Sequence, residues 1–400
     1  MHSQYIVLPR RLSYSSVFSI KPEPVTTLWY MLHEIVDPRR AQGRRHDLPT
    51  LLTLAILSLC CGSTSYLAMK EWCENYQDVL IRQVPFLAGH MPNEATFHRV
   101  FSRLDVEALE EVLGNWIQTV TPLETGEGIA LDGKTIHGTG IHIVAAFAHK
   151  ASTVLFEMGT DEKGKELVVG PEVIKKLSIK ERIVTGDALF AQRKLCKLIT
   201  HKEGGYIFRV KGNQETLEKD IRLFFKETPF GSTFTTHTTV DRWKGQMEKR
   251  TISVSSDLVD YLNWPGLTHI WQMEKEVTRK NKEGDKETIT DVSVGITRMP
   301  DELRSDMSVA EKLAAGIRGH WSIEIRCHRT RDTIFHEDHA TIRKGNAPQA
   351  MAALRNLVTS VFHRGTVRSF PTAMRRFAAQ PEELFQFLGL TAVAKAYAIA

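Results

Sequence analysis

The first third of the chain has the hydrophobic pattern of a helical bundle. Apolar residues between Leu48 and Leu59 recur every three or four positions, and Gly62 follows where a helix would end. Short polar residues that cap helices precede the later apolar stretches, so further helices are expected after Ser63 or Ser65, Asn93 and Asp105. The last of these runs to Val120 and is followed by the turn-rich residues 121–128.

From Gly128 onwards the pattern changes to short apolar or alternating runs separated by glycine and polar residues, which is typical of strands. Strands are expected at 129–131, 142–148, 153–158, 182–185 and 206–210, with helices at 173–177 and 190–200. Further β runs follow at 234–240, 250–254, 270–277 and 289–296, and helices return at 309–331 and 346–362. This order predicts an α/β fold in which a mixed sheet carries helices on its faces.

These patterns divide the chain into four expected regions. They are a flexible arm at 1–29, an all-helical domain at 30–122, an α/β domain at 123–365 with a β-rich insertion at about 230–300, and a helical tail at 366–400. The arm has little periodicity, and either Met1 or Met31 fits as the true start.

Charge is distributed unevenly along the 400 residues. The net charge is only +5, but the first 45 residues carry seven basic side chains against three acidic ones, and residues 339–381 carry seven basic side chains and no acidic one. The centre is correspondingly acidic. Two basic ends fit a partner with a phosphate backbone, and they fit two solvated helical surfaces equally well.

The cysteines and the most apolar run of residues indicate the cellular compartment in which the protein is expected. Five cysteines without CxxC spacing indicate reduced thiols in a cytoplasmic protein rather than a secreted disulfide framework. Residues 48–61 form the most apolar run, and its length of about 14 residues is short of the roughly 20 that a membrane span needs. We therefore expect no membrane segment.

A formal nucleotide-binding motif occurs at the start of the α/β region. Gly128-Ile-Ala-Leu-Asp-Gly-Lys-Thr135 fits the GxxxxGK[ST] pattern of a P-loop. A P-loop needs a strand before its first glycine and a flexible loop between the glycines, whereas here a turn comes before and the intervening residues are strand-like. An ATPase is therefore the minor alternative.

Two aspartates end predicted strands. Asp132 follows an apolar run, and Asp187 follows another whose last residue, Gly186, allows close approach of a neighbouring backbone. A lone aspartate in such a place is usually a turn former. Two of them in one predicted sheet favour a shared site that solvates charge or holds a metal.

Glu324 is a third candidate carboxylate, on a predicted helix among basic side chains. At spacings of three or four it shares a face with Ile317, His320, His328 and Arg331. On its own, this face favours a surface ion-pair network. It also fits a metal-binding carboxylate placed beside a phosphodiester.

Two short polar clusters have ordinary explanations beside the functional ones. His336-Glu337-Asp338-His339 lacks the HExxH spacing and nearby cysteines of a zinc site, so loop polarity is favoured. Arg242-Trp243-Lys244 places an aromatic between two cations, which suits base stacking with phosphate contact and suits a surface-exposed cross-strand tryptophan equally.

Taken together, the motifs resemble insertion-sequence DDE transposases of the H-repeat-associated (Rhs-linked) family over about residues 35–365. The strongest blocks are Arg318-Gly-His-Trp-Ser-Ile-Glu324, Phe335-His-Glu-Asp338, and Arg343 with Gly345-Asn-Ala-Pro348. Ile129-Ala-Leu-Asp-Gly-Lys-Thr135 and Ile183-Val-Thr-Gly-Asp-Ala188 are similar to the two aspartate motifs. Lys211-Gly-Asn-Gln214, Gly245–Arg250, Asp37–His46 and Cys61–Tyr66 resemble further family blocks.

The resemblance implies a ribonuclease-H-like core with a catalytic triad of Asp132, Asp187 and Glu324, separated by 55 and 137 residues. It further implies two Mg²⁺ ions, with Mn²⁺ as a substitute, on which Asp132 bridges both ions and the other two carboxylates each hold one. The implied activity is hydrolysis at the ends of an insertion element, followed by transfer of the 3′-OH to target DNA.

The resemblance also implies a DNA interface. The expected partners are double-stranded terminal inverted repeats and target DNA, bound by a homodimer in the synaptic complex. The expected location is the bacterial cytoplasm, in association with the nucleoid. The expected DNA- or phosphate-binding residues are Arg39, Arg44, Arg45, Lys134, Lys211, Trp243, Lys244, Arg318, His320, Arg331, Arg343 and Lys344.

The sequence departs from the family pattern near the third carboxylate. Val294-Gly295 stands in place of an aromatic pair, Ile325 in place of an asparagine, and Cys327-His-Arg329 in place of Leu-His-Trp. A catalytically silent, DNA-binding relic of a transposase is therefore the second alternative.

Overall fold

The computed structural model describes residues 28–83, 90–160, 164–243, 245–280, 285–300, 303, 307–365 and 367–388. They fall into two units, one of residues 1–104 with 358–400 and the other of residues 105–357. The C-terminal helices thus share a unit with the N-terminal ones, whereas the sequence predicted a separate tail. The helix expected at the end of the N-terminal domain belongs to the second unit.

The first unit is entirely helical in its described residues. Its α-helices are α2 (Leu48–Cys60), α3 (Tyr66–Asn75), α4 (Gln77–Gln83), α5 (Glu94–Phe101), the end of α13 (Ala347–Arg364), α14 (Phe370–Ala379) and α15 (Pro381–Leu388), with 3-10 turns at Leu32–Glu34 and Ala41–Gly43. Asp47, Ser65 and Asn93 cap α2, α3 and α5 by accepting a backbone N–H, which confirms the predicted caps of the last two.

The apolar run at 48–61 is a core helix. Every residue of α2 is buried, so this segment packs within the unit. Aromatic rings from the C-terminal helices add a second cluster, in which Phe362 meets Phe370, Phe377 and Phe387 edge to face. Within the described residues, no helix is both long and apolar enough to cross a bilayer.

The second unit is built on a nine-stranded sheet with the order β3-β2-β1-β4-β5-β9-β8-β7-β6. The strands are β1 (Gly128–Thr135), β2 (His142–Ala148), β3 (Thr153–Thr160), β4 (Ile183–Gly186), β5 (Gly205–Val210), β6 (Thr235–Trp243), β7 (Gln246–Ser255), β8 (His269–Lys280) and β9 (Lys286–Arg298).

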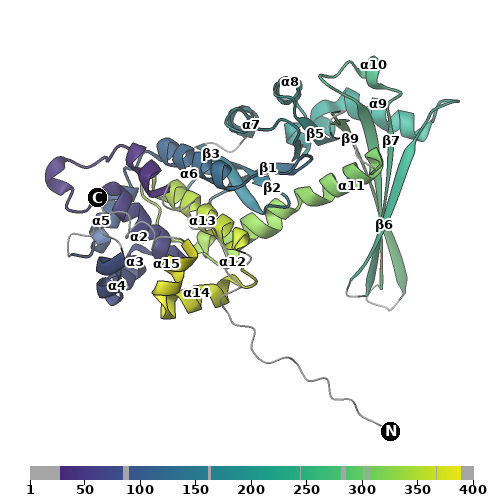
Figure 1. Ribbon diagram of the computed structural model, residues 1–400. Coiled ribbons are helices and arrows are strands. Elements are labelled where there is room, and N and C mark those ends of the chain that lie inside the picture. Colours follow the sequence, from purple (N-terminus) through teal and green to yellow (C-terminus); the bar gives the residue numbers. More distant parts are fainter. Residues whose placement is uncertain are drawn as a thin grey trace, which may run out of the picture. The chain divides into compact units, whose positions relative to one another are not determined.

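The first five strands form the ribonuclease-H-like core that the resemblance implied. Strands β1 to β3 make an antiparallel meander, and β4 and β5 are added parallel to β1. The β-rich segment then continues the same sheet, because β9 pairs antiparallel with β5 along Tyr206–Val210. Strands β6 to β9 extend well past the core as a long ribbon (Figure 1).

Helices cover both faces of the sheet, as expected for this class. Helices α7 (Glu166–Lys175), α8 (Arg193–His201) and α9 (Glu215–Lys226) pack on the face that carries Ile129 and Leu131. Helix α11 (Val309–His320) packs on the opposite face, where Ala130 lies. The other helices are α6 (Val106–Val120), α10 (Val259–Leu262), α12 (Arg329–Thr333) and the start of α13, with 3-10 turns at Ala188–Phe190, Gly212–Gln214 and Glu337–His339.

Candidate active site

Asp132 lies inside strand β1. The strand runs to Thr135, and Asp132 pairs with Ala145 of β2, so the expectation that it ends a strand was wrong. Because side chains alternate along a strand, Asp132 shares the face of Ala130, which packs against Ile323 and Cys327 of the helix that follows α11. Asp132 therefore lies on the face of the sheet that carries Glu324.

Asp187 lies where strand β4 ends, as predicted. Strands β1 and β4 run parallel, with Ala130 opposite Thr185 and Leu131 opposite Gly186. One further step in this register sets Asp132 beside Asp187 on the same face, at the roughly 4.8 Å spacing of neighbouring strands. The Asp187 side chain is exposed and accepts a hydrogen bond from the backbone N–H of Leu189 at 2.9 Å.

Glu324 begins a π-helical segment, Glu324–His328, between α11 and α12. A π-helix has one more residue in its turn than an α-helix, and such turns are frequent at functional sites. The Glu324 side chain is exposed, and partial burial raises its pKa. The third carboxylate is thus accessible, on an irregular turn over the sheet face that carries Asp132.

Asp132 responds to the charges of the other two carboxylates. Burial and the negative charges of Asp187 and Glu324 raise the pKa of Asp132 to about 7, with a smaller effect from Glu166. Among the described residues, no three His, Cys, Asp or Glu side chains are already close enough together to hold a metal ion. The charges that act on Asp132 thus come from the two other candidate carboxylates and from Glu166.

His328 lies 3.6 Å from Asp132, measured from Nδ1 to Oδ2. Burial, with the nearby charges of Arg331 and Lys134, lowers the pKa of His328 to about 3. The imidazole is therefore neutral at pH 7. It does not offset the charge of the Asp132 carboxylate.

Lys134 is paired within the protein. Its ammonium lies 2.7 Å from both carboxylate oxygens of Asp332 and 4.0 Å from Asp338, and the lysine side chain is only 12% exposed. This pair ties β1 to α12. It does not fit the expected role of Lys134 as a free phosphate-binding cation.

The expected phosphate contact of Arg331 was wrong for this structure. Arg331 is fully buried, and its Nε donates to Glu337 at 2.8 Å. Arg355 donates to the other oxygen of Glu337 at 3.0 Å. Glu337 is also buried, whereas His336 and His339 beside it are exposed, so only the glutamate of the cluster at 336–339 belongs to the core.

His320 does not carry the charge that was expected of it. Burial, with the positive charge of Arg209, lowers its pKa to about 4. A neutral imidazole at pH 7 offers no positive charge to a phosphate. Its Nδ1 lies 3.1 Å from the hydroxyl of Thr185.

The other described residues of this unit that were expected to bind DNA are exposed. Their DNA contacts stay predictions. Arg318 is 61% exposed on α11 and pairs with Asp241 of β6 at 2.8 Å. Trp243, at the end of β6, is 69% exposed. Lys211, Arg343 and Lys344 are also exposed, and Lys244 lies outside the described residues.

The three arginines of the first unit that were expected to bind DNA differ in their exposure. Arg39 is 8% exposed and binds both oxygens of Asp37, so it serves the local fold and its expected DNA contact is not supported. Arg44 is 46% exposed and contacts Asp37 at 3.7 Å. Arg45 is exposed. Arg44 and Arg45 stay predictions.

The P-loop alternative is contradicted by backbone conformation. Residues 128–135 form one extended strand that is paired with β2, so the backbone between the glycines does not wrap around a phosphate. Lys134, which a P-loop would direct to the phosphates, is held by Asp332.

Four residues near the site were not predicted from the sequence: His149, Thr185, Arg209 and Asp332. Arg209 was detectable as a charge inside an otherwise apolar strand. The other three give no local signal, because only the fold brings them beside the triad.

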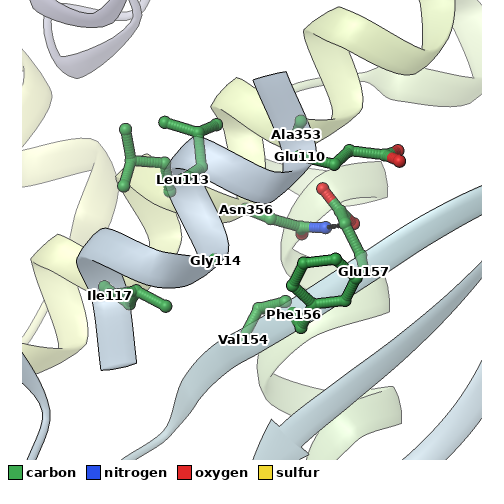
Figure 2. A pocket seen from close by; sticks show the side chains of 10 residues that line it. Glu110, Leu113, Gly114, Ile117, Val154, Phe156, Glu157, Ala353 and Asn356 are labelled. Carbon is green, nitrogen blue, oxygen red and sulfur yellow. Dashed lines mark hydrogen bonds between the residues drawn. The ribbon is translucent and has the colours of Figure 1, made fainter. Parts of the chain in front are cut away.

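A cavity of about 20 Å³, with room for one water molecule, lies among α6, β3 and α13. Figure 2 shows Glu110 of α6 and Glu157 of β3 at this cavity, with the side chain of Asn356 of α13 pointing toward Glu157. Asn356 donates to Glu157, and Gln349 donates to Glu110 at 2.8 Å. Burial raises the pKa of Glu110 well above its ordinary value and that of Glu157 to about 7.

The buried Glu157 makes stability depend on pH. Its folded-state pKa of about 7 exceeds its ordinary value of 4.5, so the folded chain holds the proton more tightly and loses this contribution as pH rises from about 4.5 through 7. Glu157→Gln cannot ionise. We therefore expect the melting temperature of the variant, relative to wild type, to increase over this pH range. A difference that is constant with pH would contradict the assignment.

Comparison with known proteins places these features in a family. Residues 121–361 match the family described as "Transposase DDE domain", and residues 29–117 match the one described as "DDE_Tnp_1-associated". The chain belongs to the DDE transposase family. The match to the first family spans all three carboxylates, and the match to the second ends inside α6.

Individual relatives agree with this membership. The chain is 27% identical over 358 residues to "H repeat-associated putative transposase YhhI" of Escherichia coli strain K12, covering 86% of this chain and 91% of the relative. It is 27% identical over 344 residues to "Putative transposase YncI" of Escherichia coli O157:H7, covering 82% and 85%.

Among solved structures, the chain matches one described as a piggyBac transposase synaptic complex with hairpin DNA. The match has a TM-score of 0.43 and 11% identity, and it covers 97% of this chain and 83% of the other. A likeness at this level carries no argument about the site.

Proposed function

We propose that this DDE transposase cleaves phosphodiester bonds at the ends of an insertion element and transfers the resulting 3′-OH to target DNA. The observation that carries the proposal is the strand register, which brings Asp132 and Asp187 side by side on the face where Glu324 lies. The raised pKa of Asp132 supports the same grouping, because it responds to both other carboxylates.

The donor set fits a hard divalent cation. Three carboxylates, two of which act electrostatically on the third, are the oxygen-rich, negative set that Mg²⁺ prefers, and Mg²⁺ keeps several water ligands rather than needing a closed protein cage. Asp132 would hold two ions, with Asp187 and Glu324 holding one each, and Mn²⁺ would substitute. When bound, such ions activate the attacking oxygen and stabilise the leaving oxygen.

The residues around the triad would bind and orient DNA. Arg318 and Lys211 are exposed cations of this unit and would contact phosphates, whereas Trp243 at the end of the β6–β7 hairpin would stack on a base. The expected substrates are double-stranded terminal repeats and target DNA. Two ends must meet for transposition, so we propose a homodimer on DNA.

The wild-type protein is expected to nick duplex DNA that carries the sequences flanking its own reading frame, with Mg²⁺ and without ATP. The measurement is the appearance of a new 3′-OH end on a sequencing gel. A matched duplex of shuffled sequence is the control. Binding to the flanking DNA without cleavage in Mg²⁺ or Mn²⁺ would favour the silent relic over the enzyme.

A further inference from the structure

A hydroxyl and two imidazoles form a hydrogen-bonded chain between α11 and the sheet. Thr185 of β4 is 1% exposed, and its Oγ1 lies 3.1 Å from His149 Nε2 and 3.1 Å from His320 Nδ1. A hydroxyl has one proton to donate, so it donates to one ring and accepts from the other. The chain thus fixes both rings at once.

His149 fills a space that two glycines leave open. It follows β2, and its backbone N–H donates to Gly128 at 2.9 Å. A Cβ at either Gly128 of β1 or Gly319 of α11 would collide with the His149 ring. The ring therefore packs against the backbone of both elements, and a larger residue at either position would displace it.

Both rings are neutral at pH 7. Burial lowers the pKa of His149 to about 3, with a contribution from His320, and lowers that of His320 to about 4. Neutral rings are suited to the donor and acceptor roles that the single Thr185 proton requires.

Thr185 and His320 are close in sequence to two of the carboxylates, and His149 packs on the strand that carries the third. Thr185 precedes Asp187 by two residues, and His320 precedes Glu324 by four. His149 packs on Gly128, four residues before Asp132 on the same strand. The chain therefore joins the three elements that carry the three carboxylates.

We propose that His149, Thr185 and His320 are positioning residues that hold Asp132, Asp187 and Glu324 at the separation that binds a divalent cation. This inference rests on the proposed function, because it assumes that the three carboxylates share a metal site. It replaces the expected phosphate contact of His320 with a role inside the protein. It also assigns a role to the pair of glycines that hold the His149 ring.

The test compares Thr185→Val, which removes the hydroxyl at constant shape, with Thr185→Ser, which keeps it. The probe is Mn²⁺ alone, and its affinity for the full-length protein is measured by electron paramagnetic resonance. We expect Thr185→Val to weaken Mn²⁺ binding by roughly 10-fold or more, as loss of an outer-shell partner does, and Thr185→Ser to restore it. Wild-type Mn²⁺ affinity in a folded Thr185→Val would overturn the proposal.

A purely structural role makes a different prediction. It would lower the melting temperature of Thr185→Val without changing its Mn²⁺ affinity at a temperature where the variant is folded. If Thr185→Val does not fold, His149→Phe removes the hydrogen bond and keeps a ring, and the same affinity comparison applies to it.

A different pattern of Mn²⁺ binding would show that the proposed function itself is wrong. If wild type and Asp132→Asn bind Mn²⁺ equally weakly, the shared metal site is wrong and both proposals fall. If Asp132→Asn loses Mn²⁺ while Thr185→Val and His149→Phe keep wild-type affinity, only the positioning role is wrong.

Discussion

Asp132→Asn is expected to reduce Mg²⁺-dependent strand cleavage by roughly 10³-fold, equivalent to about 4 kcal/mol of transition-state stabilisation. The substitution keeps the size and hydrogen-bonding shape of the side chain but removes the charge that would hold both ions. Asp132 lies within β1 and pairs with Ala145 through its backbone, so the amide should leave the strand intact. The measurement is the nicking rate on the flanking-sequence duplex.

Glu166→Gln is the matched control for this prediction. The charge of Glu166 also raises the pKa of Asp132, but Glu166 pairs with His142 beside Gly133, on the opposite side of the strand from Asp132. We expect this variant to keep most of the activity. Equal cleavage by Asp132→Asn and Glu166→Gln would exclude Asp132 from the catalytic site.

The second large effect is on stability. Glu337→Gln is expected to lower the free energy of unfolding of the second unit by about 3–5 kcal/mol, because it removes the negative charge that both buried guanidinium groups bind. Arg331 and Arg355 have side chains 0% and 2% exposed, and both bind Glu337. Burial would raise the pKa of Glu337, but these two arginines lower it overall.

Urea denaturation of Glu337→Gln measures this effect. Glu215→Gln is the control, because Glu215 pairs with Lys219 on the surface, where both side chains are more than 70% exposed. Its loss should change stability little. An unfolding midpoint for Glu337→Gln that matches the control would show that the buried cluster contributes nothing.

Hydrophobic periodicity and helix-capping residues predicted most of the helices and strands, because both signals depend on residues that are close together in the sequence. Ser65, Asn93 and Asp105 each cap the helix that was expected to follow them. Helix α9 (Glu215–Lys226) was not predicted, and α7 begins at Glu166 rather than 173. Gly170 and Pro171 disfavour a helix, yet Gly170 packs closely against Phe190, so tertiary packing overrides the local preference.

The three proposed triad residues were chosen from their motifs, but the contacts around them could not be predicted from the sequence. The shared face from Ile317 to Arg331 was derived for a continuous α-helix. The π-helical segment at Glu324–His328 changes that periodicity, and Arg331 lies in the core beside Glu337. Spacing along the chain also could not show that Lys134 meets Asp332, which is 198 residues away.

The central claim is that carboxylates from three separate elements form one divalent-metal site. Iron(II) bound in place of Mg²⁺, with peroxide and ascorbate, cuts the polypeptide backbone next to the ion. Mapping the cut positions in the wild-type protein tests the claim directly, and Asp132→Asn is the control. We predict cuts near residues 132, 187 and 324 together, suppressed by excess Mg²⁺ and lost in Asp132→Asn. Cuts confined to one segment, or unchanged in the variant, would contradict the account.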